Sequence, residues 1–194
     1  DRRPRGLGVK YRSDDLTVNK VHTRHMNMEI HRGATTAGTR ACFLGDIENL
    51  AGRRHGPSGE DVQAIAAAVY RTFGHLDLYP VVACAHRNAP QVWFNWPEAR
   101  HLVRSGPDGA DLRLLEVIAD EHLAERFDVV IIGSADHIFA EASARLAGRG
   151  VHVVAAIGRG RASRQLQIAV REVIRLPIDR TTVEVANRVE TKIS

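Results

Sequence analysis

The chain has 194 residues, of which 44% are hydrophobic and only 5% aromatic, so we expect one domain with a core of Val, Ile, Leu and Ala. No stretch is apolar for the roughly 18 residues that a transmembrane helix needs, and the charged first residues do not resemble a signal peptide. With a net charge of +4, these features exclude a membrane-spanning protein and favour a cytoplasmic one.

The positive charge is concentrated at the start of the chain. Residues 1–40 contain nine Lys and Arg against four Asp and Glu, whereas residues 41–194 contain eighteen against nineteen. A basic arm before a nearly neutral domain suggests a nucleic-acid partner, although a solvated extension fits the charge equally well. We expect a basic, flexible extension at 1–39, a folded domain at 40–178 and a tail at 179–194.

From Arg40 onward, short apolar runs alternate with helical patterns. Strands are predicted at ACFLGD (41–46), LYPVVACA (78–85), QVWFNW (91–96), DVVIIGS (128–134), VHVVAAI (151–157) and EVIRLP (172–177). Pro80 is expected at the start of the second strand. Helices are predicted at 58–74, 110–127, 137–150 and 163–170, the first with Ser58 as its N-cap and Gly74 as its stop. The alternation predicts an α/β fold with a mostly parallel five- or six-stranded sheet between two helical layers.

Cysteine usage gives no sign of a disulfide or zinc framework. Cys42 and Cys84 both fall in predicted strands and are far apart in the sequence. A zinc site would need more ligands at closer spacing. We expect two free, buried thiols, as in a protein from a reducing compartment.

Three aspartates are predicted to meet at one edge of the sheet. Asp46 ends the first strand, Asp111 opens the helix after the third, and Asp136 follows the fourth. With strand order 3-2-1-4-5, all three would face the crevice where the order reverses. Each could also be an ordinary helix cap, and the spacing leaves both interpretations open. Because clustered carboxylates are unfavourable without a cation, Mg²⁺ or Mn²⁺ is the expected cofactor.

These residues resemble the NYN domain family of PIN-like ribonucleases. The segments that carry the resemblance lie in order between Arg40 and Pro177: FLGDIENL, GADLRLLEVI and FDVVIIGSADHIFAEASARLAGRGVHVVAAIGRGRASRQL. It implies a Rossmann-like three-layer α/β/α sandwich and metal-dependent cleavage of RNA.

The resemblance also implies roles for individual residues. The catalytic set would be Asp46, Asn49, Asp111 and Asp136, with the three aspartates as metal ligands. Two positions depart from the family pattern. Ala135 stands where Gly or a second acid is usual, and a further acid of the second motif is matched only by Glu116, which becomes the candidate fourth ligand.

The remaining candidates are residues suited to binding phosphate. They are Ser134, Arg53, Arg54, Arg159, Arg161 and Ser163. Guanidinium groups and exposed backbone amides hold phosphate oxygens well, although turn, cap or ordinary basic-loop roles fit these residues too.

The sequence therefore predicts a metal-dependent endoribonuclease with RNA as its partner. The alternative is a catalytically inactive NYN-type module that binds RNA. A nucleotide-binding or phosphatase-like protein is disfavoured, since neither a Walker loop nor G-x-G-x-x-G follows the first strand. Whether the protein forms a homo-oligomer is left open.

Overall fold

The computed structural model describes residues 38–53 and 56–178. Its strands are β1 (Arg40–Asp46), β2 (Asp77–Cys84), β3 (Arg100–Val103), β4 (Val129–Gly133), β5 (His152–Ile157) and β6 (Glu172–Arg175). Its helices are α1 (Ile47–Ala51), α2 (Gly59–Phe73), α3 (Ala89–Asn95), α4 (Gly109–Asp120), α5 (Leu123–Arg126), α6 (Ala140–Gly148) and α7 (Arg164–Ala169), with 3-10 turns η1 (His86–Asn88) and η2 (His137–Phe139). The tail predicted at 179–194 lies outside the described residues. So does the extension predicted at 1–39, except for its last two residues.

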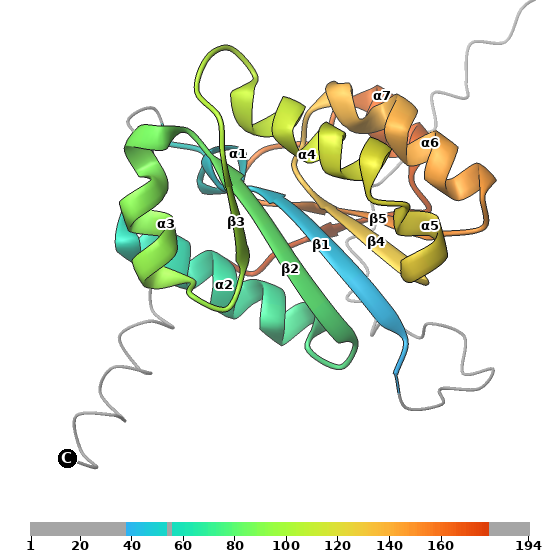
Figure 1. Cartoon of the computed structure of the whole chain (residues 1–194), viewed down its shortest axis with the longest axis horizontal. Helices are drawn as coiled ribbons and strands as arrows, with labels where there is room; N and C mark the ends of the chain where they lie inside the picture. The colour runs from blue at the N-terminus through green and yellow to red at the C-terminus, as the bar shows by residue number, and fades with distance from the viewer. Residues whose placement is uncertain (1–37, 54–55, 179–194) are drawn as a thin grey trace, which may run out of the picture. The chain divides into compact units, whose positions relative to one another are not determined.

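The six strands form one all-parallel sheet in the order β3-β2-β1-β4-β5-β6 (Figure 1). This is the order 3-2-1-4-5 considered from the sequence, with β6 added beyond β5, but the third strand is formed by other residues than those predicted. The order reverses between β1 and β4, which pair in register with Gly45 opposite Gly133. In an open parallel sheet, the crevice beyond the carboxyl ends of two such strands is where ligands bind.

Helices cover both faces of the sheet, so the predicted three-layer, Rossmann-like α/β/α fold is confirmed. Helices α4 to α7 lie on one face and α2 and α3 on the other (Figure 1). Successive side chains of β1 alternate between these layers. Leu44 packs in a cluster with Leu114 of α4 and Leu146 of α6. The Phe43 ring lies 5.8 Å from the Trp96 ring at the end of α3, between centroids.

Helix α2 forms where the sequence predicts it. The Ser58 side chain accepts a hydrogen bond from the Asp61 N–H, and the Asp61 side chain accepts one from the Ser58 N–H, which makes a capping box. The helix ends at Phe73, before Gly74. Its apolar residues recur at helical spacing and are buried: Val62, Ile65, Val69 and Phe73.

The strand predicted at 91–96 is wrong, because this segment belongs to helix α3. Pro90 occupies the first turn of α3, where its missing N–H and fixed φ are tolerated. Val92 and Trp96, four residues apart, are buried, while Phe94 is 84% exposed. That is a helical burial pattern, written in residues that also favour strands. The third strand is instead β3, which pairs only with β2 at the edge of the sheet.

Two boundaries also differ from the prediction. Pro80 is not at the start of its strand, because β2 begins at Asp77. The edge strand β3 begins opposite Val81, so Pro80 has no strand beside it on that side. The helix predicted at 110–127 is divided into α4 and α5, since His122 adopts a left-handed conformation with φ of 49° between them.

Both cysteines are free and buried, as predicted. Burial raises the pKa of the Cys42 and Cys84 thiols to about 12 in each case. Among the described helices, none has both the length and the apolar character to cross a membrane.

Candidate active site

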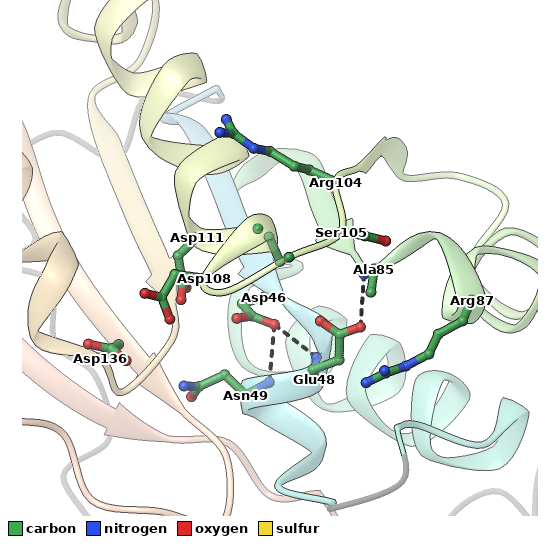
Figure 2. Close-up of a pocket in the computed structure, with 13 residues that line it drawn as sticks. Asp46, Glu48, Asn49, Ala85, Arg87, Arg104, Ser105, Asp108, Asp111 and Asp136 are labelled. Atoms are coloured by element: carbon green, nitrogen blue, oxygen red, sulfur yellow. Dashed lines mark hydrogen bonds between the residues drawn. The ribbon is translucent and has the colours of Figure 1, made fainter.

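A pocket of about 560 Å³ opens beyond the carboxyl ends of the strands, and the three predicted aspartates line it together (Figure 2). Asp46 is the last residue of β1. Asp111 lies in the first turn of α4. Asp136 follows β4, in the turn before η2. Strand order therefore brings together residues that are 90 positions apart in the sequence.

Asp46 both caps a helix and lines the pocket. Its Oδ1 accepts hydrogen bonds from the N–H groups of Glu48 at 2.9 Å and Asn49 at 3.1 Å, which starts the five-residue helix α1. The two interpretations of this residue are thus compatible, because capping occupies only one carboxylate oxygen.

Asp111 is not the N-cap of its helix. Asp108 takes that position with a left-handed φ of 50°, so Asp111 is the third residue of α4. Its side chain is buried, with 6% exposure. Oδ1 is enclosed and has no hydrogen-bond partner among the described residues. Buried carboxylate oxygens are almost always bonded, and the Asp111 carboxyl as a whole makes a side-chain hydrogen bond with Asp46.

The electrostatics of the pocket also favour a bound cation. Burial is the main cause that raises the pKa of Asp111 to about 8, and the nearby carboxyls of Asp46, Asp136 and Asp108 add to it. Burial likewise raises the pKa of Asp46, partly offset by the hydrogen bond from the Asn49 N–H. Near neutral pH the Asp111 carboxyl therefore retains a proton that a divalent ion would displace.

Asp136 is held in place by its own turn. Its Oδ1 accepts a hydrogen bond from the Ile138 N–H at 3.1 Å and lies 2.7 Å from Nδ1 of His137. Its N–H donates to Oγ of Ser134 at 3.2 Å. Ser134 is completely buried, so it supports the turn and does not reach the pocket as a phosphate ligand.

Asn49 also fixes this turn. Its Oδ1 accepts a hydrogen bond from the Ala135 N–H at 3.0 Å, which ties α1 to the segment that carries Asp136. Asn49 lines the pocket as well. Its N–H donates to Asp46, and its side-chain oxygen accepts the hydrogen bond from the neighbouring turn.

Three other candidates lie away from the aspartates or outside the described residues. Glu116 is five residues beyond Asp111, on another side of α4, and pairs with Arg104 and Arg113. It does not line the pocket, so the structure does not support it as a fourth ligand. Arg53 pairs with Asp61 at 2.7 Å, at the start of α2. Arg54 lies outside the described residues.

The basic loop after β5 lies beside the Asp136 turn but does not line the pocket. The Ser163 N–H donates to the Ala135 carbonyl at 2.8 Å, and the Ser163 side chain caps α7. Arg175 holds the loop by donating to the carbonyls of Gly158 at 2.6 Å and Gly160 at 2.8 Å. Arg159 and Arg161 are exposed on it.

Several pocket residues are not among the candidates from the sequence. They are Glu48, Arg87, Arg104, Ser105 and Asp108. Glu48 and Asp108 lie within the motifs DIEN and PDGAD, so their proximity to Asp46 and Asp111 is a signal that could have identified them. Arg87 and Ser105 carry no such signal, because Arg87 lies in η1, after β2, and Ser105 lies in the loop after β3, outside both motifs.

Comparisons with known proteins agree on the fold alone. No protein-family model and no curated protein matches the chain. Among solved structures, the chain is similar to the crystal structure of VPA0982, a protein of unknown function from Vibrio parahaemolyticus RIMD 2210633. The two are 12% identical with a TM-score of 0.54, and the match covers 73% of this chain and 95% of that one.

Proposed function

We propose that the chain is a metal-dependent endoribonuclease of the NYN type, which hydrolyses RNA phosphodiester bonds at the pocket lined by Asp46, Asp111 and Asp136. The observation that carries the proposal is the buried Oδ1 of Asp111. This atom has no hydrogen-bond partner among the described residues, and Asp111 lines an acidic pocket at the switch point of the sheet.

The residues of the pocket fit Mg²⁺ or Mn²⁺. These ions prefer carboxylate oxygens and water, and two of the three aspartates are buried while Asp136 remains partly exposed toward a substrate. Among the described residues, no three Asp, Glu, His or Cys side chains are already arranged to hold a metal ion. The unpartnered oxygen of Asp111 and its raised pKa are therefore the observations that support the fit. When bound, such an ion polarises a phosphoryl oxygen and makes a water more acidic.

The protein's own residues would supply position and charge. Asp46, at the end of β1, and Asp111, in the first turn of α4, would hold the ion, and Asp136 would complete the set from its hydrogen-bonded turn. Asn49 keeps that turn at a constant distance from α1. Hydrolysis adds water across a P–O bond, which leaves one phosphate end and one hydroxyl end. Rigid placement of the reacting groups is a major part of such catalysis.

The alternative is a catalytically inactive NYN-type module that binds RNA. One observation favours it: Glu116, the fourth acid that the family resemblance implies, pairs with two arginines away from the pocket. The same experiment distinguishes the two functions.

The test is to incubate labelled RNA with the protein in Mg²⁺, Mn²⁺ or EDTA. We expect cleavage only with a divalent ion, and a decrease of about 100-fold or more in Asp46→Asn and Asp136→Asn, because each removes a charged ligand. Asp120→Asn is the matched control, since Asp120 is exposed at the end of α4. Full activity in both pocket variants would refute the assignment, and RNA binding without cleavage under every condition would favour the inactive module.

A further inference from the structure

One wall of the pocket is the turn between β2 and α3, and Glu48 fixes it to α1. Oε1 of Glu48 accepts hydrogen bonds from the Ala85 N–H at 2.8 Å and from Nδ2 of Asn88 at 2.5 Å. The Asn88 N–H donates to the Ala85 carbonyl at 2.9 Å, which closes the turn on itself. A single carboxylate oxygen therefore holds both ends of the segment 85–88.

The same turn is also attached on its other side, to the loop between β3 and α4. Oγ of Ser105 lies 3.2 Å from the His86 backbone nitrogen, which donates to it, and 3.0 Å from Nδ1 of His86. The Arg104 N–H donates to the Cys84 carbonyl at 3.1 Å. The backbone of the turn is thus hydrogen-bonded to two separate elements.

Arg87 projects from this fixed turn and lines the pocket (Figure 2). Its side chain is exposed, and among the described residues it makes no hydrogen bond or ion pair. Arg104, the other arginine of the pocket, is already paired with Glu116. Arg87 therefore supplies a guanidinium that is available to a ligand, on a backbone that needs no rearrangement to present it.

We propose that Arg87 binds a phosphate of the RNA next to the bond that is hydrolysed, and that Glu48 is a positioning residue that holds the Arg87 turn. This inference rests on the proposed function of the pocket. Guanidinium groups bind phosphate oxygens through two parallel hydrogen bonds. An arginine on a fixed backbone, beside a carboxylate cluster, would attract the polyanion to an edge that is otherwise acidic and would favour one register of its backbone.

The first test measures RNA affinity and cleavage for Arg87→Gln and Arg87→Lys. A fluorescein-labelled single-stranded RNA is followed by anisotropy in Ca²⁺ and by single-turnover cleavage in Mn²⁺. We expect Arg87→Gln to raise the Kd and the half-saturating protein concentration about 10-fold, with a smaller change in the maximal rate. Arg87→Lys should recover most of the affinity. The slope of log affinity against log salt should fall by about 0.7, as for one lost phosphate contact.

The matched control is Arg145→Gln, which removes the same charge. Arg145 is exposed on α6, pairs with Glu141 and does not line the pocket. Its RNA affinity and salt slope should stay within about twofold of wild type. If Arg87→Gln behaves like this control, Arg87 does not bind phosphate.

The role of Glu48 is tested by comparing Glu48→Ala with Glu48→Gln, which have the same net charge. Gln retains a side-chain oxygen that can accept from Ala85 and Asn88, whereas Ala does not. We expect Glu48→Ala to bind RNA about 3–10-fold more weakly than Glu48→Gln, and this difference should vanish in the Arg87→Gln background. Equal affinities of the two Glu48 variants would overturn the positioning role, and their unfolding temperatures show whether both are folded.

These outcomes separate this inference from the proposed function. If Arg87→Gln cleaves RNA with the same kinetics as the wild type, only the proposed role of Arg87 is overturned. RNA binding that depends on Arg87 without cleavage in any metal supports the phosphate contact and overturns the nuclease. RNA that is neither bound nor cleaved by the wild type overturns both.

Discussion

The Asp111 carboxylate lies in a buried site, where burial and three further aspartates raise the free energy of its charged form. Other buried side chains near it have found partners, as Asp46 has in the N–H groups of α1. For Asp111, the described residues provide no donor to Oδ1. Proteins retain such an unfavourable group where a ligand resolves it, and a divalent cation is the ligand that suits three carboxylates.

Asp111→Asn should stabilise the ion-free protein, and more so as the pH rises. With the folded-state pKa raised to about 8, the folded protein keeps a proton that the unfolded chain loses above about pH 4. Wild-type stability therefore falls as the pH rises between these values, and the variant escapes this loss. We expect the variant to gain about 1–2 kcal/mol at pH 8 and almost nothing at pH 4, measured by denaturant unfolding in EDTA.

Added Mn²⁺ should make the wild type more stable than Asp111→Asn at pH 8. The ion stabilises the wild type by binding to it, whereas the variant lacks one of its ligands. A stability difference that does not change with pH would mean that the Asp111 carboxyl is not perturbed by its surroundings.

The aspartates could be identified from the sequence because each directly follows a strand or opens the next helix. Parallel-sheet topology then determines where they meet. Arg87 could not be found this way, because its position depends on hydrogen bonds that the N–H groups of Ala85 and His86 donate to Glu48 and Ser105, two residues distant in sequence. The role of Asp108 as the N-cap of α4 was also not predictable, since Asp108 and Asp111 are both acceptable caps.

Helix α1 is the element that connects the parts of the site. It has only five residues, yet its first turn bonds to two other segments. Asp46 starts the helix, Glu48 holds the Arg87 turn, and Asn49 holds the turn that carries Asp136. The motif DIEN thus positions both walls of the pocket, which explains why polar residues follow directly after a buried strand.

The loop after β5 packs closely on this helix, so Gly158→Ala should disturb the site. A Cβ at Gly158 would overlap the Leu50 carbonyl at the end of α1. We expect a loss of about 1–3 kcal/mol in the free energy of unfolding and reduced cleavage, because the loop also bonds to Ala135.

Gly160→Ala is the control for this substitution, since nothing lies within 4 Å of a Cβ there. It should change the free energy of unfolding by no more than about 0.5 kcal/mol. Equal unfolding midpoints for the two alanine variants in urea would contradict the close packing of the loop on α1.

Helix α2 and the central strands could be predicted from the sequence, because the spacing of their apolar residues fits one type of element and, for α2, the capping residues agree with it. The strand predicted at 91–96 is wrong because QVWFNW is rich in residues that favour strands, while the pattern of buried residues in it is that of a helix. Strand β3 escaped prediction for the opposite reason: RHLV is short and half polar, and it is a strand because β2 provides its hydrogen bonds.

In the whole molecule, the pocket depends on an intact parallel sheet, and the two thiols report on it. Cys42 and Cys84 lie in β1 and β2 and are buried. Burial raises their pKa to about 12, so the reactive thiolate is scarce and enclosed. Both should resist Ellman's reagent in the native protein and react fully in denaturant. Rapid labelling of either thiol under native conditions would show that this sheet opens locally.

The topology of the molecule explains why a nearly neutral domain can carry so acidic a pocket. Parallel strands point their carboxyl ends to one edge, so residues after β1 and β4 and in the first turn of α4 are adjacent whatever their separation in the chain. The arginines lie around this centre, on the Arg87 turn at one side and on the loop of Arg159 and Arg161 beside the Asp136 turn. Such a distribution suits a phosphate backbone that crosses a cation site.

The most direct measurement is the anomalous scattering of Mn²⁺ in crystals of the protein. We expect a peak in the pocket about 2.0–2.5 Å from carboxylate oxygens of at least two of Asp46, Asp111 and Asp136. In crystals of Asp111→Asn the peak should be weak or absent. An ion that contacts none of the three aspartates, or an unchanged peak in the variant, would contradict the proposed metal site.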